Sequence, residues 1–445
     1  MSTDLRERLE RLATRAPEPG ETADLWRRGR RRQLRRTAAG VAATLVLALV
    51  AGVGVAALWT RLPDAAPTDE PTRLVLPDRF FTPSPWLPGT DDKGPIGPLV
   101  AVIRCERRSL WGSESALAGI SATTGEYRFL DLPDEAWPNA SRLREDVEPA
   151  LSPDGRRLAY WYLGHPSGDP LVEEQGDLSI VGVAVYDTVT GHVDRMPLKS
   201  EHGIAPWALV WGGSTLFVRA GLLTEGGVLN DSDGFGSNSE GVWSWRPGRG
   251  EPTFGAGSLS LDGPGSPEGY LADSRRGWVL IGPDGSRTVV AARAAISDTP
   301  LMSPSGGWAA GISDPTPNID DSKPQPLTVV DVGSQKSWVV PGATALQVVG
   351  WRDEAHLVVL SRTRDNELLY DSVDIRSGEA RPLTQRSWGD GGSFDVAAGL
   401  WSAPVVEARE PSWPWDRRWV SGGVGLALGI VAWLVMMLRR RRVGP

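Results

Sequence analysis

The one metal-like pattern of carboxylates lies at 231–240, where the sequence reads DSDGFGSNSE. Aligned with a calcium-binding loop, Asp231, Asp233 and Glu240 occupy the third, fifth and twelfth positions, where oxygen ligands bind the ion. The first position, which such loops fill with a carboxylate, is Leu229, and no helical pattern flanks the segment. Two interpretations stay open: a calcium site formed by Asp231, Asp233 and Glu240, or a polar hairpin loop without a metal. No other cofactor is expected.

Other side chains that bind metals or attack substrates are few and scattered. The four histidines are too far apart in the sequence for a recognisable zinc motif; they are His165, His192, His202 and His356. The single cysteine, Cys105, cannot form an intramolecular disulfide, and we interpret it as a small apolar filler. The Gly-x-Ser-x-Gly motif of α/β serine hydrolases is absent. We therefore expect a protein that is not an enzyme.

Two charge-free apolar segments lie near the ends of the chain, at 37–60 and 419–438. As helices they would be about 36 Å and about 30 Å long, enough to cross a hydrocarbon core of about 30 Å. Tryptophans precede the second segment and four arginines follow it, as expected at the outer and inner surfaces of a membrane. We predict two transmembrane helices. A signal peptide for the first segment and a buried terminal helix for the second are the alternatives.

Charge is distributed unevenly along the chain, whose formal net charge is −8. Residues 1–36 carry a net charge of +5 and residues 439–445 carry +4, so the part between the two apolar segments carries −17. Basic residues beside a membrane span are retained in the cytoplasm. We therefore expect a cell-membrane protein with both termini in the cytoplasm and its acidic main domain outside. An acidic domain is a poor partner for nucleic acid.

These features divide the chain into seven parts. They are a cytoplasmic basic segment (1–36), a transmembrane helix (37–60), a Pro-rich linker (61–71), an extracytoplasmic domain (72–410), an aromatic interface segment (411–418), a transmembrane helix (419–438) and a cytoplasmic basic tail (439–445). Within the first part, the leucine spacing predicts a short amphipathic helix over 3–15, supported by Glu7 and Arg11 four residues apart. This helix is a candidate for binding a cytoplasmic partner.

The domain at 72–410 is predicted to consist of short strands. Apolar, β-branched and aromatic runs alternate with turns rich in Gly, Pro, Asp and Ser, and no long amphipathic helix is indicated. A strand, tight turn and strand recur, most clearly at 150–161, 300–310 and 348–359. The later turn glycines are separated by nearly the ~40 to 45 residues of a four-stranded propeller blade. The turn glycines are Gly125, Gly191, Gly248, Gly285, Gly333 and Gly378.

Six such units are visible, and a seventh is expected from 394–401 and 403–408, completed by 72–77. Closing the units into a ring would hide the strand edges that an open array exposes. We therefore predict an all-β fold: a six- or seven-bladed β-propeller flanked by two single transmembrane α-helices.

The segment at 152–160, SPDGRRLAY, resembles the repeat of TolB-type, WD-repeat-like bacterial β-propellers. The resemblance covers roughly residues 97–410 and implies the fold, but no particular function. The turn residues have a structural cause, because Pro presets φ, Asp bonds the following backbone and Gly accepts positive φ. Asp154 and Asp284 are therefore interpreted as turn-forming residues. At the corresponding place Ser305 departs from the pattern, but the segment is still expected to form a turn.

The chain contains 20 tryptophans, many of them in the repeats. We interpret most of them as packing within and between blades. A tryptophan-lined face that grips a glycan or a protein is the alternative.

The expected function is that of a membrane-tethered extracytoplasmic β-propeller, a non-enzymatic binding or scaffold module for a protein or cell-envelope ligand. One alternative is a transmembrane signalling or anti-sigma-like regulator with the propeller as sensor, although residues 1–36 lack the His and Cys of the anti-sigma zinc motif. Another alternative is a hydrolase that uses the propeller channel.

Overall fold

A computed structural model describes the chain over 73–411, apart from gaps, and at a few positions nearer the ends. The gaps are 109–111, 137–147, 171–177, 224–240, 257–260, 267, 276, 293, 297–298, 313–322, 364–366 and 388–393, and the outlying described positions are 7, 8, 10, 11, 14, 425 and 429. The chain divides into two units, Met1–Asp69 with Trp415–Pro445 and Glu70–Pro414. The second unit holds nearly all the described residues and is built from short strands.

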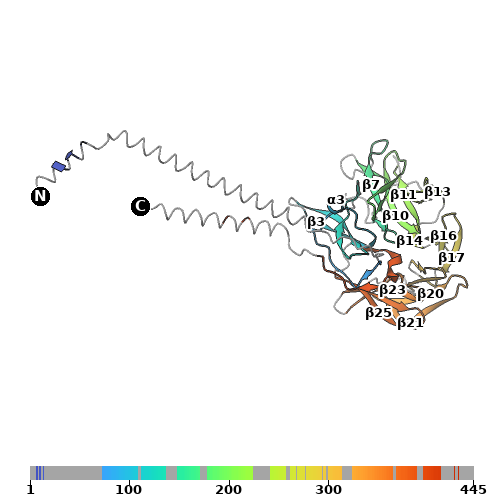
Figure 1. Ribbon diagram of the computed structural model, residues 1–445. Coiled ribbons are helices and arrows are strands. Elements are labelled where there is room, and N and C mark those ends of the chain that lie inside the picture. Colours follow the sequence, from blue (N-terminus) through green and yellow to red (C-terminus); the bar gives the residue numbers. More distant parts are fainter. Residues whose placement is uncertain are drawn as a thin grey trace. The chain divides into compact units, whose positions relative to one another are not determined.

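Six sheets of four or five strands surround a common axis (Figure 1). From axis to rim, the first blade is β26 (Phe394–Val396), β3 (Leu99–Arg108), β4 (Ser113–Ser121) and β5 (Tyr127–Phe129). The second is β6 (Ala150–Leu151), β7 (Arg157–Gly164), β8 (Ser179–Asp187) and β9 (Val193–Pro197). The third is β10 (Ile204–Gly212), β11 (Thr215–Leu222), β12 (Gly241–Trp245) and β13 (Thr253–Ala256).

The remaining blades follow the same order. The fourth is β14 (Leu261–Ser266), β15 (Gly269–Ser274), β16 (Gly277–Ile281) and β17 (Arg287–Ala292). The fifth is β18 (Leu301–Met302), β19 (Trp308–Ile312), β20 (Gln325–Asp331) and β21 (Ser337–Ala345). The sixth is β22 (Gln347–Trp351), β23 (His356–Arg362), β24 (Leu368–Asp374), β25 (Ala380–Arg386) and β2 (Arg79–Phe80). Outside the blades lie β1 (Leu76–Pro77), β27 (Val405–Val406), the short helix α3 (Thr90–Lys93) and the 3₁₀ helix η1 (Ala398–Ser402).

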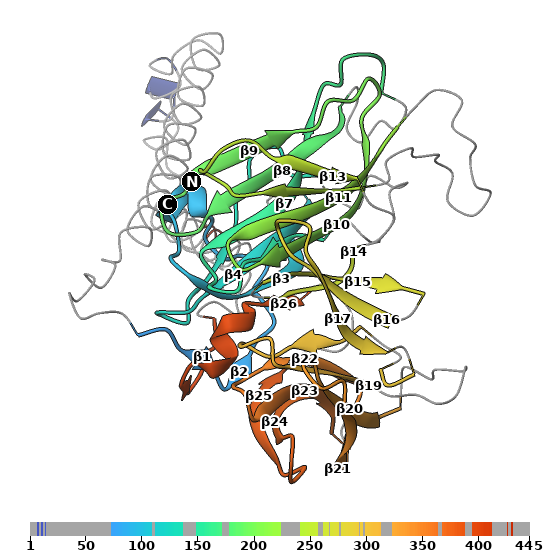
Figure 2. The same ribbon diagram turned by 90° about the vertical axis from the view of Figure 1, so that its right-hand side faces the viewer.

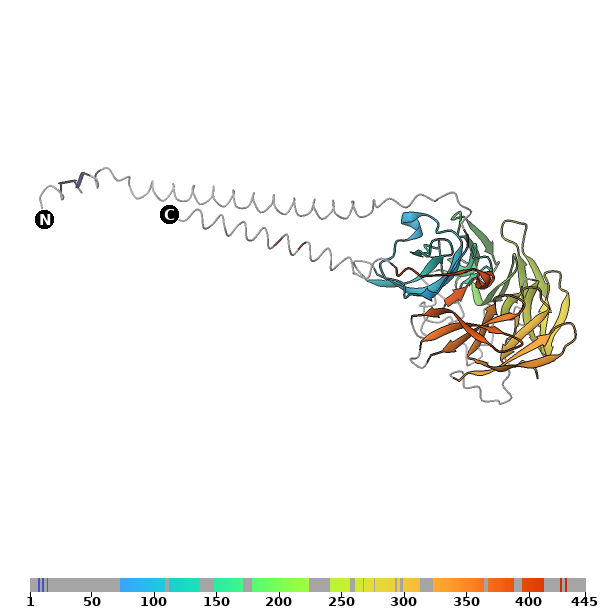
Figure 3. The same ribbon diagram turned by 60° about the horizontal axis from the view of Figure 1, so that its bottom comes forward.

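The C-terminal part of the propeller closes the ring. β26 pairs antiparallel with β3, with Phe394 opposite Ile103, so a strand from the end of the domain becomes the innermost strand of the first blade (Figure 2). β1 pairs parallel with β27, and β2 adds parallel to β25 on the outside of the sixth blade. The blue and orange ends of the propeller therefore lie side by side (Figure 3).

This pairing confirms the all-β propeller and gives it six blades. The seventh blade expected from 394–401, 403–408 and 72–77 is wrong. The strand at 394–396 belongs to the first blade, and Leu76–Pro77 pairs with Val405–Val406 in a separate two-stranded sheet. The chain ends close the ring and cover strand edges instead of forming a further sheet.

The predicted transmembrane segments lie almost entirely outside the described residues. Gly425 and Gly429, within the second segment, are helical. Among the described residues, no helix is long and apolar enough to cross a membrane. Near the N-terminus, Glu7 and Arg11 are helical, and Arg11 Nη2 lies 3.6 Å from Glu7 Oε1, as their spacing predicts.

Asp154 and Asp284 form turns, as predicted. Asp154 Oδ1 accepts a hydrogen bond from Arg156 N at 3.1 Å in the turn between β6 and β7, where Gly155 has a φ of +70°. Asp284 Oδ1 accepts one from Ser286 N at 3.0 Å between β16 and β17. Both carboxylates therefore serve the local backbone.

In the second blade, the turn between β8 and β9 begins with a side chain that accepts hydrogen bonds from the following backbone. Asp187 Oδ1 accepts them from the N–H groups of residues 189 and 190 at 2.9 and 2.8 Å, and Gly191 then has a φ of +76°. In the fifth blade the left-handed position is Gln335, with a φ of +58°, whereas the sequence spacing predicts Gly333. Gln335 N donates to Asp331 O at 2.7 Å, and the corresponding bond closes this turn in the first, second and sixth blades.

Alternating strand directions give the ring two faces. The turn face carries the tight turns within blades, such as 122–126, 152–156 and 188–192. On the connection face lie the described residues 130–136, 148–149, 165–170 and 198–203, which belong to the longer links between strands. The N-terminal end of the propeller lies at the turn face, where Val75 N donates to Ala122 O at 2.8 Å. The C-terminal segment contacts the turn face at Gly399, whose N donates to Pro153 O at 2.9 Å, and then runs parallel to β1. It reaches Ala408, whose N donates to Asp78 Oδ1 at 2.8 Å, beside Gln385 and near the connection-face end of β25.

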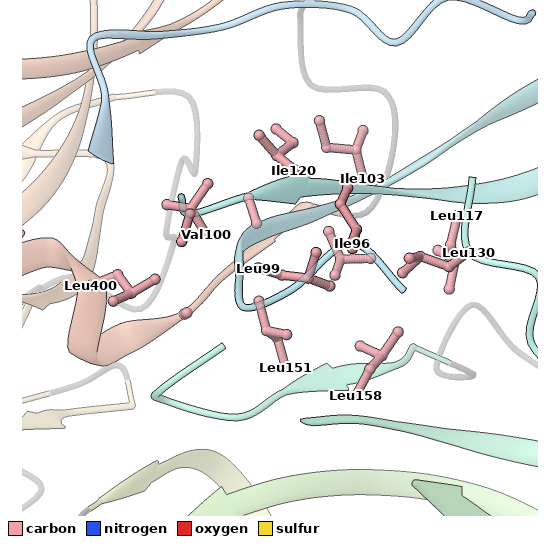
Figure 4. Packing of buried hydrophobic residues seen from close by; sticks show 14 of the residues in the cluster. Ile96, Leu99, Val100, Ile103, Leu117, Ile120, Leu130, Leu151, Leu158 and Leu400 are labelled. Carbon is pink, nitrogen blue, oxygen red and sulfur yellow. The ribbon is translucent and has the colours of Figure 1, made fainter. Parts of the chain in front are cut away.

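Apolar side chains fill the space between the blades. The largest cluster joins the first blade to its neighbours, and Figure 4 shows Leu99 of β3 facing Leu151 and Leu158 of the second blade, with Leu400 of η1 nearby. All four are buried. Burying one such side chain contributes about 1.5 to 3 kcal/mol. The ring is thus stabilised mainly by packing between sheets.

Tryptophans link neighbouring blades by hydrogen bonds as well as by packing. Trp211 Nε1, in the third blade, donates to Ala150 O of the second at 2.9 Å. Trp351 Nε1, in the sixth blade, donates to Leu301 O of the fifth at 3.0 Å. Both rings are buried. The interpretation of tryptophans as blade-packing residues is confirmed for these two.

Two glycines with the same backbone preference should tolerate alanine very differently. Gly155 and Gly285 have φ of +70° and +81°, but a Cβ at 155 would lie 1.9 Å from Leu99 O whereas one at 285 meets nothing within 4 Å. We expect Gly285→Ala to cost about 1 to 2 kcal/mol of left-handed strain. Gly155→Ala should cost about 1 to 3 kcal/mol more through overpacking against the neighbouring blade. Equal losses in denaturant unfolding would contradict this packing.

The hydrogen bond of Trp211 can be separated from its packing by comparison with Trp161. Both are buried, but Trp161 Nε1 has no acceptor among the described residues. Trp211→Phe should therefore lower the free energy of unfolding by about 1 kcal/mol more than Trp161→Phe, because it leaves the Ala150 carbonyl without its donor. Urea unfolding of the two variants measures the difference, and a larger loss for Trp161→Phe would argue against the inter-blade bond.

Candidate functional site

The carboxylates of the predicted calcium loop lie outside the described residues. Asp231, Asp233 and Glu240 all fall within 224–240, between β11 and β12. The calcium site stays a prediction. Elsewhere, the described part of the chain contains no group of three or more His, Cys, Asp or Glu side chains that could hold a metal ion.

Three of the four histidines lie in or beside the second blade and His356 lies in the sixth, and the contacts described for them are local. His202 is buried, with Nδ1 2.7 Å from Asp169 O. His356 Nδ1 lies 2.8 Å from Asp353 Oδ1 in the turn between β22 and β23. His192 Nε2 lies 3.3 Å from Asp194 Oδ1. Each histidine therefore has a partner of its own, as expected for structural residues.

Cys105 behaves as the sequence predicts. Its Sγ donates to Ala116 O at 3.5 Å on the neighbouring strand, and burial raises the pKa of the thiol to about 12. The thiolate, which is the reactive form, is therefore scarce at neutral pH.

Burial shifts the pKa values of three ionisable groups between the first and second blades, namely Arg104, Glu135 and Asp395. Together with Glu148, which interacts electrostatically with Arg104 and Asp395, they form what we call the closure cluster. Arg104 interacts electrostatically with Glu148 and Glu135, and Glu148 with Asp395. Three carboxyl groups share one guanidinium, so the fully ionised cluster carries a net charge of −2.

Asp395 is placed by the strand that closes the ring. It lies opposite Val102 in the pairing of β26 with β3. Its Oδ2 accepts a hydrogen bond from the backbone N–H of Leu151, on the innermost strand of the second blade, at 2.7 Å. One carboxyl group therefore joins β26 to the next blade, and its position depends on ring closure.

Glu135 is placed by the connection between β5 and β6, which runs along the end of β7. Ala136 N donates to Trp161 O at 2.9 Å, and Leu163 N donates to Asp134 O at 2.7 Å. Glu135 itself forms an antiparallel bridge with Tyr162. The backbone on both sides of Glu135 is thus fixed, which holds its side chain near Arg104.

Burial weakens the acidity of two members of the cluster. Desolvation raises the pKa of Asp395 to about 7, opposed by the N–H of Leu151 and reinforced by Glu148. Desolvation likewise raises the pKa of Glu135 to about 8, opposed by the positive charge of Arg104. Burial also lowers the pKa of Arg104, opposed by Glu148 and Glu135. Both carboxyl groups can therefore exchange a proton near neutral pH.

The cluster lies toward the connection face, because Glu135 and Glu148 both belong to the 130–149 connection. A proton donor and acceptor near neutral pH could serve acid–base chemistry or could respond to a cationic group of a ligand. The sequence motifs did not identify these residues. The available signal was a charge inside an apolar strand: Arg104 follows the run LVAVI, and Asp395 sits between Phe394 and Val396.

Comparisons with known proteins show similarity at the level of structure only. No family model matches the sequence. A search of curated proteins also finds no match. Solved structures that resemble the chain include TolB from Acinetobacter baumannii, at 12% identity over 68% of this chain and 69% of TolB, with a TM-score of 0.38.

Peptidases are also among the similar structures. Dipeptidyl peptidase 4 of Porphyromonas gingivalis matches at 10% identity over 55% of this chain and 40% of its own, with a TM-score of 0.29. A puromycin-hydrolyzing peptidase of Mycobacterium tuberculosis matches at 14% identity over 64% of this chain and 36% of its own, with a TM-score of 0.24. We take the blade arrangement from the strand pairing itself and transfer no activity from these proteins.

The raised carboxyl pKa values predict how the free energy of unfolding depends on pH. When folding raises the pKa of a carboxyl group, its contribution to stability is fully present below the pKa of the unfolded chain, about 4. This contribution is lost as the pH rises through the pKa of the folded protein. For Asp395 and Glu135 the folded values are about 7 and about 8, so the free energy of unfolding should fall between about pH 4 and about pH 8.

Asp395→Asn should flatten the lower part of this profile, because its amide oxygen can still accept from Leu151 N but does not titrate. The turn carboxylates have lowered pKa values, so their titration changes the free energy of unfolding only below about pH 4, outside the range in which Asp395 and Glu135 titrate. These carboxylates are Asp284, Asp331 and Asp374. Urea unfolding at a series of pH values provides the measurement. An unchanged slope in Asp395→Asn would show that Asp395 has an ordinary pKa.

Proposed function

We propose that the protein is a membrane-tethered, extracytoplasmic propeller that acts as a non-enzymatic binding module through its connection face. The observation that carries the proposal is the position of the chain ends. β1 pairs with β27, and Ala408 N donates to the Asp78 side chain at 2.8 Å, so the two ends lie side by side where the first and sixth blades meet. Tethers that follow from both ends would hold this part of the ring toward the bilayer.

The connection face has the properties of a recognition surface. Its described connections include 130–136, 165–170 and 198–203, and binding residues in proteins are concentrated on such loops when a rigid scaffold positions them. It also carries the closure cluster, whose carboxyl groups change charge near neutral pH. The two apolar segments at 37–60 and 419–438 and their basic flanks support the tethering part of the proposal.

The ligand class is a protein or another component of the cell envelope. Six blades around one axis form a broad surface, and the net charge of −17 predicted for the region outside favours partners with basic groups. We assign no catalytic step, because a pair of carboxyl groups with raised pKa does not define a reaction without a substrate placed against it.

Photo-crosslinking in native membranes tests the orientation and the binding role together. A photoreactive residue at exposed Lys199, on the connection between β9 and β10, should form an adduct with a protein or envelope ligand. The same probe at exposed Thr124, in the turn between β4 and β5, should form adducts mainly with lipid. The reverse pattern would refute the orientation.

A topology reporter supplies the control for this experiment. Alkaline phosphatase fused after Pro445 should be inactive in intact cells, because the proposal places that end in the cytoplasm. An active fusion, or recovery of the protein from membranes by a carbonate wash, would refute the tether.

A further inference from the structure

We propose that the closure cluster binds a cationic side chain of a protein partner, a guanidinium or an ammonium group, between the inner strands of the first and second blades. The inference rests on the proposed binding function, because it names the chemical group that the partner presents. It starts from the balance of charge in the cluster, where three carboxyl groups are accompanied by a single guanidinium.

Glu135 is the member of the cluster whose carboxyl group lacks a close partner. Among the described residues, no hydrogen bond or ion pair reaches this group, and Arg104 acts on it only as a nearby positive charge. The protein nevertheless encloses Glu135 so far that desolvation dominates its acidity, while the residue keeps some exposed surface. A desolvated carboxylate without a partner costs free energy, which a positive group of a ligand would recover.

The backbone holds Glu135 in position before any ligand arrives. Glu135 lies opposite Tyr162 in an antiparallel bridge, and opposite residues of such a pair have their side chains on the same side of the sheet. Tyr162 packs in the apolar cluster that contains Leu99 and Leu158 and joins the second blade to the first. Glu135 therefore points toward the first blade, which carries Arg104.

Asp395 brings a second desolvated carboxyl group to the same place from β26. Its Oδ2 accepts from Leu151 N at 2.7 Å, and the N–H of Val396 also favours its ionised form. It too keeps some exposed surface. Glu148, which is exposed, interacts with both Asp395 and Arg104. A cationic side chain that entered the cluster would reduce its surplus of negative charge and could form charge-assisted hydrogen bonds.

The other polar groups near Glu135 are engaged elsewhere. Arg195 of β9 donates to Asp134 Oδ2 at 2.9 Å, and the hydroxyl of Tyr160 donates to Pro133 O at 3.0 Å. Within the described parts of the chain, the carboxyl groups do not converge as the ligands of a metal ion do. The ligand that fits the cluster is therefore an organic cation.

Binding of a cation should be coupled to the release of protons. Folding raises the pKa of Asp395 to about 7 and that of Glu135 to about 8, and a nearby positive charge lowers such values again. Carboxyl groups that are protonated near neutral pH then lose their protons when the ligand binds. The affinity should rise between about pH 6 and about pH 8.5, a range over which ordinary surface carboxylates stay ionised.

Isothermal titration calorimetry of the full-length protein in a neutral detergent tests the site. The probe is the peptide acetyl-Gly-Arg-Gly-amide, whose only charge is its guanidinium group. It should bind at least about tenfold more tightly at about pH 8.5 than at about pH 6, and its apparent binding enthalpy near neutral pH should depend on the ionisation enthalpy of the buffer, which reports proton release. The matched citrulline peptide has nearly the same shape without the charge and should bind at least about tenfold more weakly.

Variants locate the binding in the cluster. Glu135→Gln and Asp395→Asn should each lower the affinity at about pH 8.5 by about tenfold and reduce the proton release, and the new amide of Asp395→Asn can still accept from Leu151 N. The matched control is Asp134→Asn, which removes the same charge from an exposed neighbour that is paired with Arg195, and it should leave the affinity unchanged. Thermal unfolding at about pH 8.5 should show that Glu135→Gln is folded, because it removes the cost of a desolvated charge.

Equal binding of the two peptides, an affinity that does not change with pH, or an equal loss in Asp134→Asn and Glu135→Gln would overturn the inference. Absence of peptide binding together with protein adducts at Lys199 would overturn it and leave the proposed function standing. Binding of the arginine peptide with no adduct at Lys199 would support the cationic site and count against the partner-binding role.

Discussion

The pairing of β26 with β3 joins the end of the propeller to its beginning, and the other contacts of the ring depend on it. A stack of four-stranded sheets would leave the inner edge of β3 and the last blade exposed. By supplying the innermost strand of the first blade from 394–396, the chain removes that edge and brings the first and sixth blades together. The large apolar cluster that includes Leu99, Leu158 and Leu400 can form only after this closure.

Closure also determines where charge is buried. Asp395 is carried into the interior by the closing strand, where it accepts a hydrogen bond from Leu151 N and loses much of its hydration. Its carboxyl group and that of Glu135 then titrate near neutral pH, which neither would do in the unfolded chain. The same strand that stabilises the ring therefore adds a pH-dependent cost to it. This cost is consistent with a group retained for binding rather than for stability.

The ends of the propeller cover strand edges of their own ring. β1, β2 and β27 come from the terminal segments and cover the region between the first and sixth blades. On the sixth blade, β2 adds to β25 and Phe80 is completely buried. An edge that would otherwise expose unpaired backbone groups is removed in this way.

Local features of the sequence were sufficient to predict the all-β propeller and its turns. Asp154 and Asp284 were identified because a turn-forming Asp, with Pro before it and Gly after it, needs only its neighbours to define its hydrogen bonds. The blade count, the left-handed position at Gln335 and the site could not be obtained in this way. Whether 394–396 starts a seventh blade or completes the first depends on which edge it meets across the ring, some 290 residues away in sequence.

The candidate site differs from the predicted calcium loop in the same way, because one depends on tertiary contacts and the other on local sequence. Asp231, Asp233 and Glu240 suggested a calcium site because ligand spacing is a local property of the sequence, although Leu229 stands where such loops have a carboxylate. Asp395 and Arg104 lack such spacing, and their altered acidity arises from desolvation by blades that only tertiary folding brings together. The sequence by itself determined the strand and turn pattern and the two apolar segments, since these depend on short-range preference and hydropathy. Only the tertiary structure decided the number of blades, the position at which the two ends of the propeller meet and the place where charge is buried, because each depends on contacts between distant residues.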